Sequence, residues 1–122
     1  MKIIIKTKRI YNGYDKSDGF RILVDRLWPR GLKKEEAKIN LWMKDIAPSN
    51  ELRKWFHHES ENMSEQDRWD VFVKRYNAEL AMKKNLCEEL ISKSDTITLL
   101  FSSKETDHNQ AIVLKNFLEK NL

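Results

Sequence analysis

Residues Thr96–Phe101 read TITLLF, and the polar segment SSKETDHN follows them at positions 102–109. An uncharged run rich in β-branched and large apolar side chains predicts a strand buried within a sheet. The chain after it predicts a helix that is capped by Thr106 or Asp107. The apolar face of that helix holds Ala111, Leu114, Phe117 and Leu118. A buried strand followed by a helix is typical of α/β proteins.

Predicted strands and helices also alternate over the rest of the chain, toward the N-terminus. Apolar residues at helical spacing run over 69–80 and again over 86–91 after a pair of lysines, which predicts two helices or one kinked helix. Short helices are predicted at 33–38 and after Ser49, a favourable N-cap. Further strands are predicted at Ile3–Ile5 (extending toward Ile10), Phe20–Asp25 and Ile39–Ile46. We therefore expect one α/β domain over residues 1–122, with a small, mostly parallel sheet of about four strands covered by helices in a Rossmann-like layered architecture.

Composition limits the class of protein. The chain has 122 residues, with 34% charged and 40% hydrophobic residues, which excludes a disordered tail and a membrane-embedded protein. The single cysteine, Cys87, excludes an internal disulfide and a cysteine zinc cluster, and its place on an apolar stripe predicts a core residue. No segment resembles a signal peptide or a bilayer span, so we expect a soluble, cytoplasmic protein with no membrane partner.

The net charge of +4 is concentrated in one part of the chain. The segment Arg26–Lys54 holds eight basic and four acidic residues, whereas residues 61–122 carry a net charge of −2. An anionic partner is therefore expected at the basic segment. Nucleic-acid binders often carry a larger basic excess, so the pattern favours a local pocket for a small anion.

The candidate site follows from the sheet. Ligands of parallel sheets bind outside the carboxyl ends of the strands, which here precede residues 25–31, 47–50 and 102–109. The first segment reads DRLWPRG and contains Arg26, Trp28 and Arg30. Arginine suits bidentate binding of phosphate or carboxylate, and tryptophan suits stacking, so we expect these three residues to bind the ligand. The alternative is structural: a tryptophan in the core and an arginine paired with Asp25 or another acid.

The third segment precedes the last helix, whose N-terminus attracts anions. Ser102, Lys104 and Asn109 are expected to contact the ligand there, and His108 is the candidate general acid or base. The alternative is that the histidine packs against the sheet while Asp107 caps the helix.

Two further charged residues lie near the end of the strand predicted at Ile39–Ile46. Lys44 is expected to line the pocket, and Asp45 is a second catalytic candidate, although such a pair is often a surface salt bridge. In the next helix Leu52, Trp55 and Phe56 are interpreted as core, with the neighbouring basic residues exposed. Adjacent histidines at 57 and 58 do not share a helical face, so no metal site is expected. No cofactor is expected for the chain either.

The segments VDRLWPRG (24–31), LWMKDIAPS (41–49), ELRKWF (51–56) and TLLFSSKETDHNQA (98–111) together resemble the YeaO-like branch of a bacterial family of unknown function. The resemblance runs from about Ile10 to Leu118 and implies a small cytosolic α/β protein without an assigned reaction. The broader family carries a late Cys-His-Arg segment, where this chain has Asp107-His108-Asn109. The resemblance therefore carries over no thiol chemistry, but it strengthens the case for a shared site.

Three hypotheses of function follow. The leading one is a small enzyme or binding protein for an anionic, phosphate-bearing or nucleotide-like molecule, with catalysis left open. The second is a nucleic-acid-binding module that uses Arg26–Lys54, which would bind in a strongly salt-dependent way. The third is a non-enzymatic interaction protein or homodimer, which an exposed Trp42 or Trp55 in a large apolar patch would favour. The oligomeric state is left open.

Overall fold

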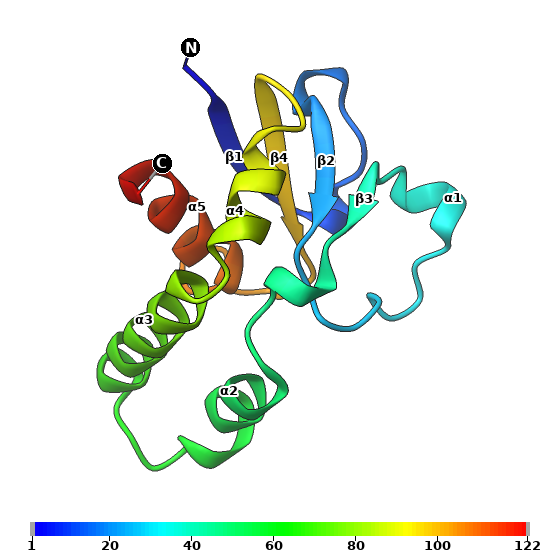
Figure 1. Ribbon diagram of the computed structural model, residues 1–122. Helices are drawn as coiled ribbons and strands as arrows, with labels where there is room; N and C mark the ends of the chain where they lie inside the picture. The colour runs from blue at the N-terminus through cyan, green and yellow to red at the C-terminus, as the bar shows by residue number, and fades with distance from the viewer. Residues whose placement is uncertain (1, 122) are drawn as a thin grey trace.

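A sheet of four parallel strands organises residues 2–121, the part of the chain that this computed structural model describes. The order across the sheet is β1–β4–β2–β3, so the apolar strand β4 has a parallel neighbour on each side (Figure 1). The strands are β1 (Ile4–Arg9), β2 (Phe20–Leu23), β3 (Leu41–Trp42) and β4 (Thr96–Phe101). The expected small α/β fold is confirmed, and every strand pairing among these residues is parallel.

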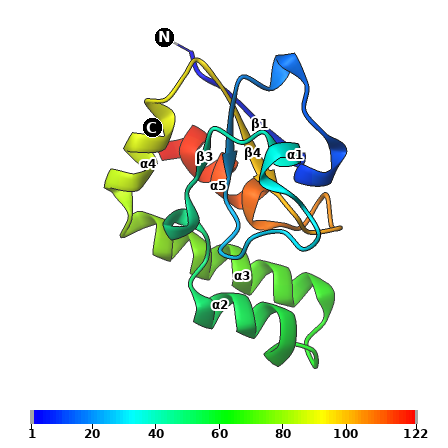
Figure 2. The same cartoon turned by 90° about the vertical axis from the view of Figure 1, so that its right-hand side faces the viewer.

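Five α-helices occur in the described residues. They are α1 (Lys34–Ala37), α2 (Asn50–Lys54), α3 (Glu65–Ala81), α4 (Lys84–Ile91) and α5 (Gln110–Asn121). A π-helical turn, Trp55–Glu59, continues α2, and the apolar stripe of residues 69–91 forms two separate helices. Figure 2 shows α2 beside α3 below the sheet, and the two helices are in contact. No helix in residues 2–121 is long and apolar enough to cross a membrane.

Both faces of the sheet are covered, as the sequence of β2 and β4 predicts. Successive side chains of a strand point to opposite faces. Ile22 and Leu99 join the main core with the side chains of α3, α4 and α5. Leu23 and Leu100 join a smaller apolar cluster, which the chain between β2 and β3 covers on the other face. All four side chains are 0% exposed.

The strand predicted at Ile39–Ile46 is wrong in extent. Its last backbone bond to β2 joins the Met43 N–H to the Leu23 carbonyl at 3.0 Å, and a 3-10 turn over Lys44–Ile46 follows. β2 itself ends at Leu23, so the partner strand has nothing further to pair with. Because of this turn, Ile46 packs in the main core and is 0% exposed, and the strand-like alternation of buried and exposed side chains stops.

The start of the last helix also differs from the prediction. Asn109 caps α5 by accepting a hydrogen bond from the Ile112 N–H at 3.1 Å, and its amide donates to the Glu105 and Thr106 carbonyls. Asp107 is exposed and caps nothing among the described residues. The cap lies at Asn109 because the chain between β4 and α5 first forms a turn around this buried amide.

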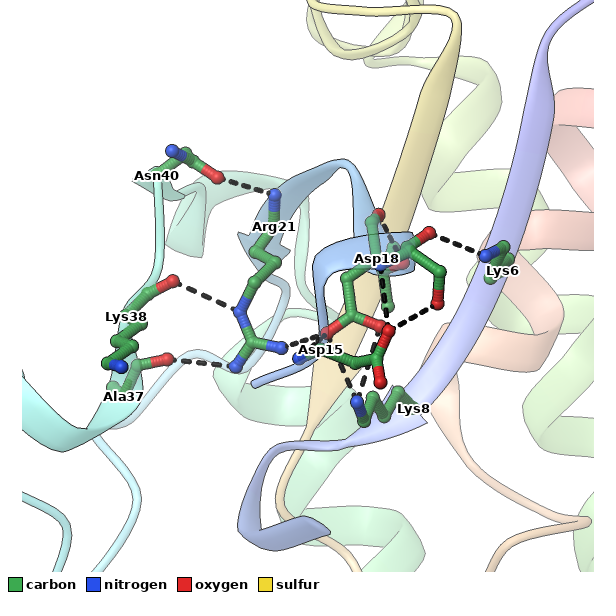
Figure 3. Close-up of polar contacts among 10 residues, drawn as sticks. Lys6, Lys8, Asp15, Asp18, Arg21, Ala37, Lys38 and Asn40 are labelled. Atoms are coloured by element: carbon green, nitrogen blue, oxygen red, sulfur yellow. Dashed lines mark hydrogen bonds and ion pairs between the residues drawn. The ribbon is translucent and has the colours of Figure 1, made fainter. Parts of the chain in front are cut away.

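A buried ion pair joins β2 to the loop before it (Figure 3). The Arg21 guanidinium, 1% exposed, pairs with the Asp18 carboxylate and donates to two backbone carbonyls at the end of α1 at 2.9 and 3.0 Å. Burial alone would raise the pKa of Asp18, but hydrogen bonds from the Asp15 N–H, Lys8 and Arg21 outweigh burial and lower the pKa. This cluster holds the β1–β2 loop and α1 against the face of the sheet that carries Leu23 and Leu100.

Candidate functional site

A cavity of about 370 Å³ opens where β2 and β4 end. All three segments that were expected to converge contribute to it, together with side chains of α2, the π-helical turn and α3. They meet because β2 and β4 are parallel neighbours whose carboxyl ends lie at one edge of the sheet. The lining residues are Asp25, Arg26, Leu27, Trp28, Pro29, Arg30, Pro48, Arg53, Phe56, His57, Phe72, Ser102, Ser103, His108, Asn109 and Gln110.

The buried carboxylate of the cavity is Asp25, directly after β2 and 7% exposed. It accepts a hydrogen bond from the Ser102 N–H at 3.0 Å on one oxygen and from the Gln110 side-chain amide on the other. Burial raises the pKa of Asp25, and these two donors only partly offset the loss of water. None of the ion pairs among residues 2–121 involves Asp25, so the predicted alternative of an Asp25–Arg26 pair is not formed.

Arg26 connects two of the converging segments. Its guanidinium donates to the Pro48 carbonyl at 2.9 Å and to the Ala47 carbonyl at 3.1 Å. Two of its donor nitrogens are therefore used to hold the segment after the 3-10 turn against the end of β2. Arg26 lines the cavity, and part of its role is structural.

Trp28 forms a wall of the cavity and also packs behind it. Its indole N–H donates to the Leu32 carbonyl at 2.6 Å, and its ring meets Trp42 edge to face at 5.4 Å. Trp42 in turn donates to the Asp25 carbonyl at 2.7 Å. Both indoles are half-buried, as is Trp55, so neither Trp42 nor Trp55 forms the exposed apolar patch that would favour a dimer interface.

Two arginines face the cavity with free donor capacity. Arg30 is exposed, and it is the Arg30 backbone carbonyl that accepts the Tyr11 hydroxyl at 2.7 Å. The buried Nε of Arg53 has no hydrogen-bond partner among the described residues. The Nη2 of the same guanidinium donates to the Asn50 side-chain oxygen at 3.5 Å. An unpaired guanidinium N–H that is shielded from water is costly unless a ligand occupies it.

Aromatic rings form the opposite side of the cavity. Phe56 and Phe72 have ring centroids 4.4 Å apart, and His108 stacks on Trp69 at 4.4 Å with the planes 11° apart. Burial lowers the pKa of His57, and the neighbouring positive charges of Arg53, His58 and Arg68 lower it further.

Some expected site residues lie elsewhere. Lys44 holds its ammonium over the Trp42 ring at 4.8 Å, and Asp45 is exposed in the 3-10 turn. Neither residue lines the cavity, because the chain turns away from the sheet one residue after β3. Lys104 is exposed and also lies outside the lining, whereas Ser102, His108 and Asn109 belong to it. Asn109 contributes mainly as the cap of α5.

Sequence reasoning missed several lining residues. Arg53 was expected on an exposed face, and His57 was considered only together with its neighbour. Their spacing of four residues was the available signal, since side chains at i and i+4 share a helical face. Gln110 was not singled out at all, although it lies in the first turn after the expected histidine. Within residues 2–121 no group of three or more His, Cys, Asp or Glu side chains forms a candidate metal site.

The chain is similar to proteins without an assigned function. A family described as "Inactive DUF488-N3 subclade" matches residues 4–122. The uncharacterized protein YeaO of Escherichia coli (strain K12) is 45% identical over 116 residues, which covers 93% of this chain and 96% of that protein. The uncharacterized protein Rv3073c of Mycobacterium tuberculosis (strain ATCC 25618 / H37Rv) is 36% identical, with 93% and 92% covered. No solved structure matches significantly.

Proposed function

Because the chain belongs to the family described as the inactive DUF488-N3 subclade, we propose that its cavity binds a small anionic molecule and that the protein acts through binding instead of turnover. The description of this family as inactive supports the absence of turnover. The anion is suggested by the lining of the cavity, and the proposed contacts are made by Arg30 and Arg53.

The charge of the cavity carries this proposal. Three arginines, at positions 26, 30 and 53, line it against the single carboxylate of Asp25, a balance of three positive charges to one negative. The buried Arg53 Nε has no protein partner among the described residues, and an anionic oxygen of the ligand would accept its hydrogen bond. A volume of about 370 Å³ is in the range of pockets that hold small molecules.

A nucleic-acid footprint has weaker support. The basic side chains of Arg26–Lys54 divide between separate places: the arginines line the cavity, Lys38 lies over the Tyr14 ring and Lys44 lies over the Trp42 ring. Polyanions are usually bound by charges that follow one continuous surface. Binding to DNA or RNA that is tight at low salt and falls steeply with added salt would favour this alternative over the pocket.

Calorimetric titration with inorganic phosphate at low ionic strength tests the proposal. Wild type and Lys74→Ala should show saturable one-site binding, since Lys74 is exposed on α3 and does not line the cavity. Arg30→Ala and Arg53→Ala should each weaken binding by about tenfold or more, because a hydrogen bond to a charged group contributes about 1.5–3 kcal/mol.

Wild-type protein that shows no saturable phosphate binding at millimolar concentration would refute the proposal. Unchanged affinity in both arginine variants would refute the assigned site. Phosphorus NMR during long incubation with glycerol 3-phosphate should show an unchanged ester, and release of phosphate would contradict binding without turnover.

A further inference from the structure

The polarity of the cavity changes with depth. Its outer part holds the exposed side chains of Arg30 and His57. Its inner part holds Asp25, 7% exposed, and Phe72, 3% exposed. A ligand that enters therefore meets the Arg30 guanidinium with one end, and a carboxylate and an aromatic ring with the other.

The inner carboxylate has unused acceptor capacity. A carboxylate oxygen can accept two hydrogen bonds. In Asp25, one oxygen accepts from the Ser102 N–H at 3.0 Å and the other accepts from the Gln110 amide, which leaves one position on each oxygen. No basic side chain forms an ion pair with it in residues 2–121. This environment suits a neutral donor from the ligand, such as a hydroxyl group.

Neighbouring backbone acceptors are already in use. The carbonyls of Ala47 and Pro48 accept from Arg26. The carbonyls of the two serines after β4 accept from the Nε of Arg9 at 3.3 and 3.1 Å. Asp25 is the one carboxylate among the lining residues, and so the strongest acceptor for a ligand donor placed deep in the cavity.

This inference rests on the proposed function and deepens it. We propose that the ligand is a small phosphate ester with hydroxyl groups at its far end, the chemistry of a sugar or polyol phosphate. Arg30 and Arg53 hold the phosphate, and a ligand hydroxyl donates to Asp25. The rings of Phe56 and Phe72 offer an apolar surface to the carbon skeleton of the ligand. An ester with a purely apolar tail would bury Asp25 without replacing its lost water, which is costly.

Two phosphate esters of equal charge and similar size separate the possibilities. Wild-type protein is titrated with glycerol 3-phosphate, propyl phosphate and inorganic phosphate. We expect glycerol 3-phosphate to bind about tenfold or more tightly than propyl phosphate, the fold-change that one hydrogen bond to a charged group provides. Without a buried acceptor, the added hydroxyls would weaken binding through their own desolvation.

The outcomes distinguish this inference from the proposed function. If inorganic phosphate binds but the two esters bind equally, or propyl phosphate binds more tightly, the inference is overturned and the anion site stands. If none of the three binds, both are overturned. This comparison uses the wild-type protein, so it decides the matter even if a variant does not fold.

Asp25→Asn tests the residue assigned to the hydroxyl. The variant removes a negative charge from the cavity, so it should bind inorganic phosphate at least as tightly as wild type while losing most of the preference for glycerol 3-phosphate. Asp107→Asn is the matched control, because Asp107 is exposed just before α5 and does not line the cavity. A preference that persists in Asp25→Asn would overturn the role of this carboxylate.

Discussion

Replacement of Asp18 by asparagine should reveal how strongly the buried ion pair of β2 stabilises the fold. The substitution keeps the size of the side chain and an oxygen that can accept the Asp15 N–H, but it removes the negative charge. Arg21 is 1% exposed, and its guanidinium is a cation. The variant therefore contains an uncompensated buried cation.

The expected cost follows from this burial. Removal of one partner of a buried ion pair costs about 3–5 kcal/mol. The lower part of that range applies here, because two carbonyls at the end of α1 continue to accept from the Arg21 guanidinium. We expect a loss of about 3 kcal/mol in the free energy of unfolding, which lowers the melting temperature of a chain of this length by roughly 10 °C.

Urea unfolding followed by tryptophan fluorescence at neutral pH measures this loss. Asp95→Asn, an exposed carboxylate before β4, is the control and should change stability by less than about 0.5 kcal/mol. The pKa of Asp18 is lowered in the folded state, so its contribution is complete above the ordinary value of 3.8 and is lost as the pH falls through the lowered value. The difference between wild type and Asp18→Asn should shrink accordingly in acid. A loss below about 1 kcal/mol at neutral pH, or a loss independent of pH, refutes the reasoning.

Three further substitutions test other features of the structure. Asp25→Asn should raise the free energy of unfolding of the unliganded protein at neutral pH, because burial raises the pKa of Asp25. This gain in stability should shrink as the pH falls through the raised pKa and vanish below 3.8. A gain that does not change with pH contradicts the raised pKa of Asp25. Arg26→Ala should lose about 2 kcal/mol in urea unfolding, since the Pro48 carbonyl loses its donor and the Ala47 carbonyl keeps only the Lys83 ammonium. A near-neutral result would show that the contacts of Arg26 to the segment after the 3-10 turn are dispensable. Gly19→Ala should cost more than about 2 kcal/mol, because its φ is +67° and the added Cβ would collide with the Thr96 backbone. Gly13→Ala, with φ +84° and no atom within 4 Å of the added Cβ, should lose less stability than Gly19→Ala when both variants are compared by thermal unfolding. Equal losses would exclude the collision with Thr96 as the cause.

The sequence predicted the elements best where one local pattern dominates. The run TITLLF matches β4 residue for residue, and Ser49 caps α2 as expected, its hydroxyl accepting from the Leu52 N–H. Both predictions depend on neighbours within a few positions of the chain. The strand predicted at Ile39–Ile46 failed because its length is set by its partner, β2, which ends early.

The candidate site was predictable in outline for a similar reason. Parallel strands place their carboxyl ends at one edge, so the segments after β2 and β4 converge without further information. The i, i+4 spacing of Arg53 and His57 places them on one helical face, but which way that face points depends on how α2 and the π-helical turn pack beside α3. The exclusion of Lys44 and Asp45 depends on a turn that begins one residue after β3.

The sequence alone therefore determined the α/β class, the central strand, the core position of Cys87 and the concentration of positive charge after β2. Only the tertiary structure decided what each charged group does. Arg26 is largely engaged by two carbonyls, whereas the Nε of Arg53 is buried without a partner among residues 2–121. The physical reason is that a guanidinium acts through the acceptors within hydrogen-bond distance. The acceptors of Arg26 belong to a segment more than twenty residues away in the chain, and the packing that brings them close is not a local property of the sequence.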